Sequence, residues 1–174
     1  KLITRPACEK ICRFAFDYAR KNDRKKVTAV HKANIMKLTD GLFLRTFREV
    51  AEDYPEIAAD DCIIDALCMK LVQKPEQFDV LVAPNLYGDI ITDEAAQIQG
   101  GVGTAGSANV GDRYAMFEAI HGSAPRMIER GMGDYANPQS ILRAEVMLLR
   151  HIGRAAAADK LEAALDAYPA VITG

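Results

Sequence analysis

One short apolar run most constrains how this chain can fold. The sequence FDVLVAP, residues 78–84, is closely bounded by Pro75 and Pro84, as expected of a buried strand. A turn follows it, and a helix is expected to begin near Asp89. In such a helix Asp89 and Asp93 are four residues apart, so both carboxylates project from one face, just past the carboxyl end of the strand. Ligands of open α/β sheets bind at that position.

Two interpretations of this acidic pair are open. Carboxylates suit Mg²⁺ or Mn²⁺ rather than zinc, and a cation between Asp89 and Asp93 would relieve their mutual repulsion. Alternatively, acids near a helix N-terminus complement its dipole, each contributing roughly 0.3–1 kcal/mol. For an isolated DxxxD pattern the second interpretation is the more frequent one.

The rest of the sequence alternates between helical and strand patterns. Apolar residues at helical spacing predict helices over 4–22, 40–52, 60–71, 138–153 and 155–167. Strands are expected at KVTAVHKA, from Lys26, and at YAMFEAI, residues 114–120. The glycine-rich stretch GGVGTAGSANVG, residues 100–111, is the best candidate for a crossing between domains. This alternation predicts an α/β fold.

Composition excludes several functional classes. The 174 residues are 49% hydrophobic and 26% charged, as in an ordinary globular protein. Net charge is −2 and the longest basic stretch is residues 24–26, so neither nucleic acid nor a membrane is an expected partner. With no transmembrane-length apolar run and no signal-peptide pattern, a cytoplasmic location is expected. The four cysteines include no CxxC, which argues against zinc and predicts reduced thiols packed in helices.

The sequence HGSAPRM, residues 121–127, predicts a loop that can hold a phosphate, because small residues leave backbone N–H groups free and accessible. Alone the signal is weak, since glycine, serine and proline occur in many loops. It is neither the GxGxxG fingerprint nor a P-loop, and a lone His121 is more often structural than catalytic.

Together these segments resemble the isocitrate and isopropylmalate dehydrogenase family of metal-dependent β-decarboxylating dehydrogenases. The resemblance runs from Leu2 to the end and rests on TAVHKANIMKLTDGLF, IIDALCM, QFDVLVAPNLYGDIITDEAA, GGVG with SANVG, FEAIHGSAP and YANP, in the family's order. HKANIMKLTDGLF is most similar to the NAD-dependent isocitrate dehydrogenases. The resemblance implies a partial family fold. Residues 1–99 would form part of the smaller substrate and dimerisation domain, and residues 100–174 the carboxyl-terminal part of the larger cofactor-binding domain.

Family roles transfer residue by residue. Lys32 matches the catalytic lysine that handles proton transfer, and without its flanking motif it would be interpreted as a salt-bridged surface lysine. Asn34 matches the asparagine at the substrate and nicotinamide end. The residues that match the Mg²⁺- or Mn²⁺-binding aspartates are Asp65, Asp89 and Asp93. The residues that match the loop holding the adenosine half of the dinucleotide are His121, Gly122, Ser123, Ala124, Pro125, Arg126, Met127 and Asn137.

The implied reaction is the oxidative decarboxylation of isocitrate to 2-oxoglutarate, a step of the tricarboxylic acid cycle. The cation chelates the hydroxyl oxygen and a carboxylate of a 2-hydroxy diacid or triacid, hydride passes to the nicotinamide, and the β-keto acid loses CO₂. In the family's homodimer the active sites are shared. Lys32, Asn34 and Asp65 are expected to reach the partner's site, whereas Asp89 and Asp93 act in their own.

Some positions depart from the family pattern. Arg126 stands where NAD-using members typically carry an acidic residue, and a guanidinium suits a phosphate, so NADP is possible. Ala136 before Asn137 resembles the NAD type, and NAD is the expected cofactor. The loop over 127–136 is about three residues longer than usual by this resemblance, and Gly106 replaces a common proline.

The family's substrate-binding arginines, its substrate-selecting serine or threonine and its partner tyrosine lie upstream of the segment seen here. We therefore expect a fragment that is inactive alone. Isopropylmalate, homoisocitrate or tartrate are alternative substrates. A noncatalytic regulatory subunit is an alternative from another class, although such a subunit would be expected to lose metal or lysine positions, and all four residues are present. A dimerisation module without activity is the third reading.

Overall fold

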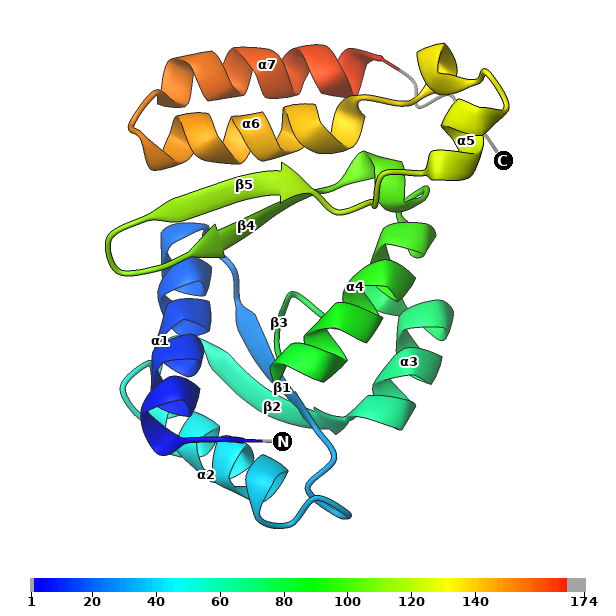
Figure 1. Cartoon of the computed structure of the whole chain (residues 1–174). Helices are drawn as coiled ribbons and strands as arrows, with labels where there is room; N and C mark the ends of the chain where they lie inside the picture. The colour runs from blue at the N-terminus through cyan, green and yellow to red at the C-terminus, as the bar shows by residue number, and fades with distance from the viewer. Residues whose placement is uncertain (1, 169–174) are drawn as a thin grey trace. The chain divides into compact units, whose positions relative to one another are not determined.

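The structure is a computed structural model that describes residues 2–168 and divides into two compact units, Lys1–Ala95 and Ala96–Gly174 (Figure 1). The elements up to the end of α4, in chain order, are α1 (Arg5–Lys21), β1 (Lys26–His31), α2 (Thr39–Ala51), β2 (Ala58–Ile63), α3 (Ile64–Gln73), the 3₁₀ turn η1 (Pro75–Gln77), β3 (Val80–Val82) and α4 (Asn85–Ile98). The elements that follow are η2 (Val102–Thr104), β4 (Gly106–Val110), β5 (Ala115–Ala119), α5 (Pro125–Glu129), η3 (Gly133–Tyr135), α6 (Gln139–His151) and α7 (Ala155–Ala167).

The first unit is built on a parallel sheet with strand order β2-β1-β3. The central strand β1 pairs His31 with Ile63 of β2 and Ala29 with Val82 of β3. Five of its six residues are buried, since helices cover both faces, and its near-continuous apolar sequence suits a strand of that kind. The three strands are parallel, so their carboxyl ends lie at one edge. The α/β class predicted from the sequence is confirmed.

Alternate residues of β1 contribute to two different cores. Val27 and Ala29 pack in a cluster with residues of α1 and α2, including Phe16. Val30 packs in a second cluster with Leu67 of α3 and Ile91 of α4. This is the period of two expected when successive side chains of a strand point to opposite faces. The first unit therefore has three layers, with the sheet between two helical layers.

Helix α1 follows directly from its amphipathic pattern. Pro6 occupies its first turn, which tolerates the missing N–H group, and the buried face is made of small and aromatic residues. Phe16, which is fully buried, stacks on Phe47 at 5.4 Å and on Tyr54 at 4.9 Å between ring centroids. Burying such a ring stabilises the fold by about 1.5–3 kcal/mol, so this aromatic group is a main anchor of α1.

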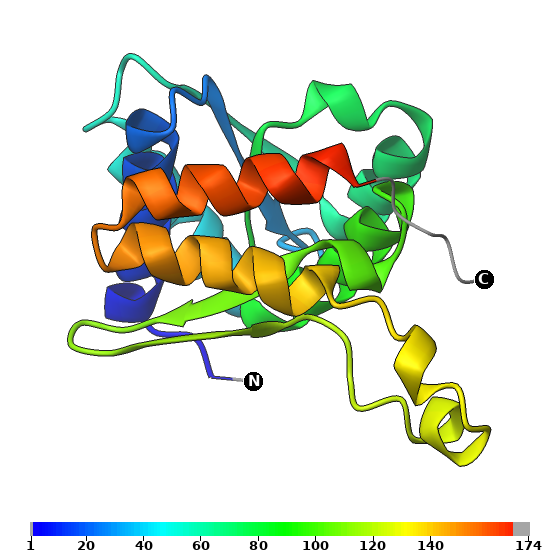
Figure 2. The same cartoon turned by 90° about the horizontal axis from the view of Figure 1, so that it is seen from above.

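The second unit is an antiparallel β4–β5 hairpin with two helices. Gly106 pairs with Ala119 and Val110 with Ala115. Helix α6 packs on both strands, and α7 packs on α6 through a cluster that includes Val146, Ala158 and Leu165. Both views show α6 and α7 side by side (Figure 2). Helix α7 has the bounds predicted from the sequence.

Several expectations about local structure were wrong. Residues 60–63, predicted as the start of a helix, belong to the strand β2. Residues 106–110 form β4 instead of a connection, and α4 begins at Asn85, four residues before Asp89. Strand β2 contains the consecutive acidic residues Asp60 and Asp61, which are uncommon in strands. Both interact with side chains of the neighbouring strand β1. Asp60 accepts a hydrogen bond from the buried Thr28 hydroxyl, and Asp61 contacts His31.

Strand β4 was missed because its sequence is small and glycine-rich, and the reason for the glycine is a contact with α6. A Cβ atom on Gly106 would lie 2.4 Å from the backbone nitrogen of Ala144 and 2.7 Å from its Cα. Neither an alanine nor a proline fits at that separation. Gly106 is therefore required by the close approach of two backbones.

All four cysteines are free. Cys8 and Cys12 lie in α1 and Cys68 in α3 as predicted, but Cys62 lies in β2. Burial raises the pKa of Cys12 to about 12, so this thiol stays protonated and unreactive. Among the helices of residues 2–168, none is long and apolar enough to cross a membrane.

Candidate functional site

Three candidate segments follow the carboxyl ends of the three parallel strands. Lys32 comes directly after β1, and Asp65 lies in the first turn of α3, which follows β2 without a break. Helix α4 begins three residues after β3 and carries Asp89 and Asp93. Because parallel strands end at a common edge, the fold brings residues from distant parts of the sequence to one side of the sheet. Ligands of open α/β sheets bind at this edge.

Lys32 and Asp65 form an ion pair. The Lys32 Nζ atom lies 2.6 Å from Asp65 Oδ1, and the two side chains are 27% and 68% exposed. The hydrogen bond from Lys32 holds the pKa of Asp65 below its ordinary value, so this carboxylate stays ionised. The pair fits both a salt-bridged lysine and a catalytic lysine held beside a carboxylate, and the exposed carboxylate remains accessible to a cation.

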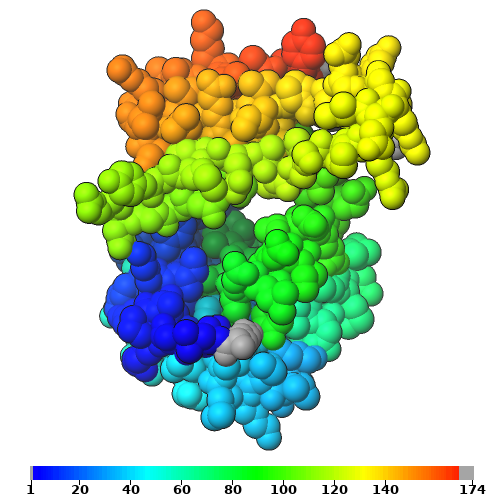
Figure 3. Space-filling view, viewed as in Figure 1, coloured from blue at the N-terminus to red at the C-terminus, as the bar shows by residue number. Residues whose placement is uncertain are grey.

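Asp89 and Asp93 lie on the exposed part of α4, one turn apart. Because α4 begins at Asn85, neither residue is in the first turn, which contains no acidic residue. Stabilisation by the helix dipole falls off within that turn, so the dipole does not account for the pair. Figure 3 shows the side chains of α4 at the surface of the first unit.

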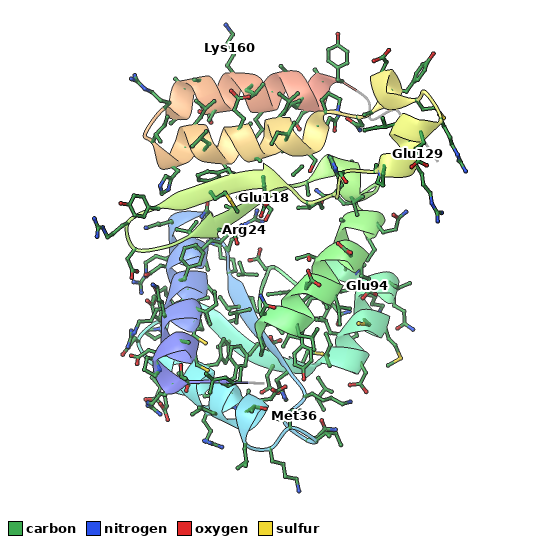
Figure 4. The ribbon with its side chains drawn as sticks, viewed as in Figure 1. Arg24, Met36, Glu94, Glu118, Glu129 and Lys160 are labelled. Atoms are coloured by element: carbon green, nitrogen blue, oxygen red, sulfur yellow. The ribbon has the colours of Figure 1, made fainter. Side chains whose placement is uncertain are left out.

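Helices α3 and α4 pack against each other. Leu67 and Ile91 belong to one buried cluster. Burial, together with a hydrogen bond to Glu94 of α4, which Figure 4 labels, raises the pKa of Cys68. Even so, in the described part of one chain no three histidine, cysteine or acidic side chains are grouped so as to hold a metal ion. The structure thus joins Asp65 to Lys32 and does not bring the three predicted metal ligands together.

The turn that carries Lys32 and Asn34 is exposed and apolar at its tip. Asn34 is exposed, and Ile35 and Leu38 are 68% and 86% exposed. Met36, labelled in Figure 4, lies on the same turn. Exposed apolar side chains of this kind are typical of surfaces at which proteins associate.

Two residues near Lys32 were missed by sequence reasoning. Asp40, fully buried in the first turn of α2, accepts the backbone N–H of Lys32, and the buried His31 accepts the N–H of Ala33. The signal that could have found Asp40 is an acidic residue inside an otherwise apolar helix face. That pattern does not predict which hydrogen-bond donor the Asp40 carboxylate binds.

In the second unit the predicted cofactor residues begin where β5 ends. Residues 121–126 are all exposed, while Met127 and Asn137 are half-buried. The buried Ser140 accepts the N–H of Ile120 and donates its hydroxyl to the carbonyl of Ala105, so α6 is tied to both strands just before this loop. The Asn137 side chain accepts the N–H of Gln139 at the start of α6. Asn137 and the base of the loop are therefore held close to the same end of α6.

The segment between these two anchors projects beyond the end of α6 (Figure 2). It includes the short helix α5 and the turn η3, which the sequence predicted as loop. Ala124 takes a left-handed conformation, with φ of 45°, directly before Pro125. The Arg126 side chain is exposed.

Comparison with known proteins identifies the family. Residues 1–170 match the family Isocitrate/isopropylmalate dehydrogenase. The chain is 55% identical over 162 residues to isocitrate dehydrogenase [NADP] of Rickettsia bellii, covering 93% of this chain and 33% of that protein. It is 51% identical over 166 residues to 3-isopropylmalate dehydrogenase of Archaeoglobus fulgidus, covering 95% of this chain and 50% of that protein.

A solved structure agrees with these matches. The crystal structure of isocitrate dehydrogenase from Methylococcus capsulatus superposes with a TM-score of 0.90 at 52% identity, over 94% of this chain and 47% of that one. The chain thus spans about one third to one half of the proteins it matches. Because the match extends over nearly every residue and the fold is shared, the chain belongs to the isocitrate/isopropylmalate dehydrogenase family.

Proposed function

We propose that this chain carries the proton-transfer lysine and the metal-binding aspartates of an NAD(P)-dependent dehydrogenase that converts isocitrate to 2-oxoglutarate. The observation that carries the proposal is the Lys32–Asp65 pair at the carboxyl edge of the sheet, with Asp89 and Asp93 on the adjoining α4. The name of the Rickettsia bellii relative supports isocitrate as the substrate. Because the chain covers only part of its relatives, we assign the activity to the full-length protein.

The donor set fits a hard divalent cation. Asp89 and Asp93 offer exposed carboxylates one turn apart, without histidine or cysteine among the predicted ligands, and this favours Mg²⁺ or Mn²⁺. These two residues would hold the ion, and Asp65 from a second copy of the chain would complete its protein ligands. When bound, the cation supplies a Lewis acid for negative charge that develops on substrate oxygens.

The residues near Lys32 would handle protons and orient the substrate. The Lys32 ammonium can donate a proton to a substrate atom within hydrogen-bond reach and, once neutral, take one back. Asp65 accepts a hydrogen bond from it and so restricts its position. The exposed Asn34 amide, two residues on, would bind the substrate and the nicotinamide.

We propose a homodimer with shared sites. Its support is that the helices carrying Asp65, Asp89 and Asp93 also carry exposed apolar side chains, which are Met69 and Val72 on α3 and Leu86 and Ile90 on α4. An exposed apolar surface of this kind marks a site of association. A second copy covering it would bring the turn that carries Lys32 and Asn34 to the neighbour's Asp89 and Asp93.

Mixing two inactive variants tests this arrangement. In a shared site, a Lys32→Met subunit and an Asp89→Asn subunit together form one intact site in each heterodimer. Random pairing of equal amounts should then restore about a quarter of the wild-type activity. If each site is built from one chain, the mixture stays inactive.

For the cofactor we propose NAD, with NADP as the alternative. Residues 121–127 and Asn137 would hold the adenosine half. The exposed Arg126 supports the alternative, because a guanidinium can pair with a 2′-phosphate.

Reduction of NAD or NADP by isocitrate in the presence of Mg²⁺, measured on the full-length protein, tests the proposed function. Activity that survives chelation of divalent cations would contradict it, as would failure with every 2-hydroxy diacid. The name of the Archaeoglobus fulgidus relative favours 3-isopropylmalate as a second candidate. The ratio of kcat/KM for the two acids decides between them.

A further inference from the structure

Two neighbouring backbone amides at the candidate site are held by buried side chains. The Lys32 N–H donates to Asp40 Oδ2 at 2.9 Å, and the Ala33 N–H donates to His31 Nδ1 at 3.0 Å. Both amides follow the end of β1, where no ladder partner is available, and in most loops such groups bond to water. Asp40 is fully buried and His31 is 4% exposed, so here the protein supplies both acceptors.

Asp40 joins three segments. Besides the Lys32 amide, it accepts the Thr39 hydroxyl at 3.2 Å and forms a hydrogen bond with the Tyr87 side chain of α4. An acid in the first turn of α2 would complement the helix dipole equally well if it were exposed. Burying a carboxylate is costly unless donors surround it. The inward position of Asp40 is therefore explained by the groups that it binds.

The hydrogen-bond geometry also fixes the tautomer of His31. A backbone amide can only donate, so Nδ1 must accept and carries no proton. The remaining nitrogen, Nε2, donates to Asp61 at 3.0 Å. Burial raises the pKa of Asp61, but hydrogen bonds from Arg48 and His31 outweigh it, so the pKa is lowered and the carboxylate stays ionised. The imidazole ring is thus held in one orientation, with its acceptor nitrogen toward the Ala33 amide.

We propose that Asp40 and His31 are positioning residues that fix the backbone at Lys32, and through it the place of the Lys32 ammonium beside Asp65. The proposal rests on the proposed function, because proton transfer is the step that needs this precision. A displacement of 1 Å costs about 10²-fold in rate. Tyr87 lies two residues before Asp89, so Asp40 also links the lysine turn to the helix that carries the acidic pair.

Residue-resolved amide hydrogen exchange on the full-length protein tests the positioning directly. Asp40→Ala should speed exchange at the Lys32 amide about tenfold, because the loss of one hydrogen bond changes the opening equilibrium by about that factor. The change at the Ala33 amide should be smaller. His31→Phe should speed exchange mainly at the Ala33 amide, with a smaller change at the Lys32 amide. Asp40→Asn keeps an oxygen acceptor and should restore slow exchange. Asp60→Ala is the matched control, because it removes an acid that binds Thr28 and Lys26 at the opposite end of β1.

Kinetics form the second arm. Asp40→Ala should lower kcat about 10²-fold and leave the KM for the nucleotide unchanged, whereas Asp40→Asn should recover most of the rate. Asp60→Ala should change neither value. A purely structural role would instead lower the melting temperature and the active fraction while the remaining enzyme keeps its kcat.

The two arms separate the possible failures. If the wild-type protein oxidises no 2-hydroxy acid, the proposed function fails and amide exchange still decides the positioning. Unchanged exchange at Lys32 in a folded Asp40→Ala protein, or an unchanged kcat in an active one, overturns the positioning role. If Asp40→Ala does not fold, His31→Phe decides, because His31 is the acceptor of the Ala33 amide. Unchanged exchange at Ala33 in a folded His31→Phe protein overturns the positioning role.

Discussion

In the first unit, the turn that carries Lys32 is held by buried side chains outside it, whereas in the second unit residues 121–136 are held by hydrogen bonds within themselves. His31 and Asp40 accept the amides of the first turn. Among residues 2–168, every hydrogen bond formed by the 121–136 segment stays inside that segment. Its anchors, Ile120 with Ser140 and Asn137 with Gln139, lie just beyond its ends.

The difference fits two kinds of task. A group that moves a proton must stand at a fixed place before the substrate arrives, so buried acceptors around its backbone are useful. A segment that binds a large ligand, which is the role proposed for residues 121–127, can be ordered by that ligand and needs firm support only at its ends. On this basis, changes in the first unit should affect the chemical step, and changes in the second unit should affect cofactor binding and local stability.

The largest expected effect comes from the acidic pair. If these residues hold the cation as proposed, Asp89→Asn or Asp93→Asn should lower kcat/KM of the full-length protein about 10³-fold, or about 4 kcal/mol of transition-state stabilisation, because one proposed ligand loses its charge. Both residues are exposed, so the melting temperature should hardly change. Glu94→Gln on the same helix is the control, since Glu94 is half-buried and is not one of the predicted ligands. Equal losses of kcat/KM in Asp89→Asn, Asp93→Asn and Glu94→Gln would contradict a specific role of Asp89 and Asp93 in cation binding.

Lys32→Met should lower kcat about 10²-fold or more, the usual contribution of a general acid or base. A second readout does not depend on activity. Without its hydrogen bond from Lys32, the pKa of Asp65 should rise toward about 3.9, which carboxyl NMR can follow. An unchanged Asp65 pKa would mean that the ion pair is not formed in solution.

Gly106→Ala should disturb only the second unit. The added Cβ would meet the backbone of Ala144 and force β4 and α6 apart, at a cost of about 2 kcal/mol. Amide exchange should speed up in α6 and at Ile120 and stay unchanged at Lys32. Gly133→Ala is the matched control, because a Cβ there meets no atom within 4 Å. Faster exchange at Lys32 would contradict the independence of the two regions.

Arg126→Asp should change cofactor choice without changing the chemical step. Loss of the guanidinium and the added negative charge should raise the KM for NADP relative to NAD about tenfold. The kcat with the preferred nucleotide should stay the same. A change in kcat with an unchanged ratio of KM values would mean instead that Arg126 acts in the chemical step, as expected for residues of the first unit.

The smallest expected effect is the pH dependence of the Lys32–Asp65 pair. A carboxyl whose pKa is lowered on folding contributes stability that is fully present above its unfolded pKa of about 3.9 and is lost as pH falls through the lower folded pKa. The difference in unfolding free energy between wild type and Lys32→Met should therefore be constant near neutrality and vanish in acid. Denaturant titrations across this range measure it. A difference that persists below both pKa values would point to packing of the lysine stem.

Sequence patterns predicted the amphipathic elements well and the polar strands badly. Helices α1 and α7 follow from apolar spacing and end signals within a few residues. The pattern predicts a helix from residue 60, within β2, because apolar and acidic positions alternate there at helical spacing. Their partners, Thr28 and His31, lie about thirty residues away, and only the pairing of β2 with β1 brings them into contact.

By itself the sequence determined the α/β alternation, the family, and the chemical types of the candidate residues, because periodicity and motif wording are local properties of the chain. Only the tertiary structure decided that Asp65 pairs with Lys32, that Asp40 turns inward to hold the Lys32 amide, and that Gly106 leaves room for α6. Each of these contacts joins segments from different elements. Which way a polar side chain faces depends on the donors that packing places around it, and a local pattern carries no information about them.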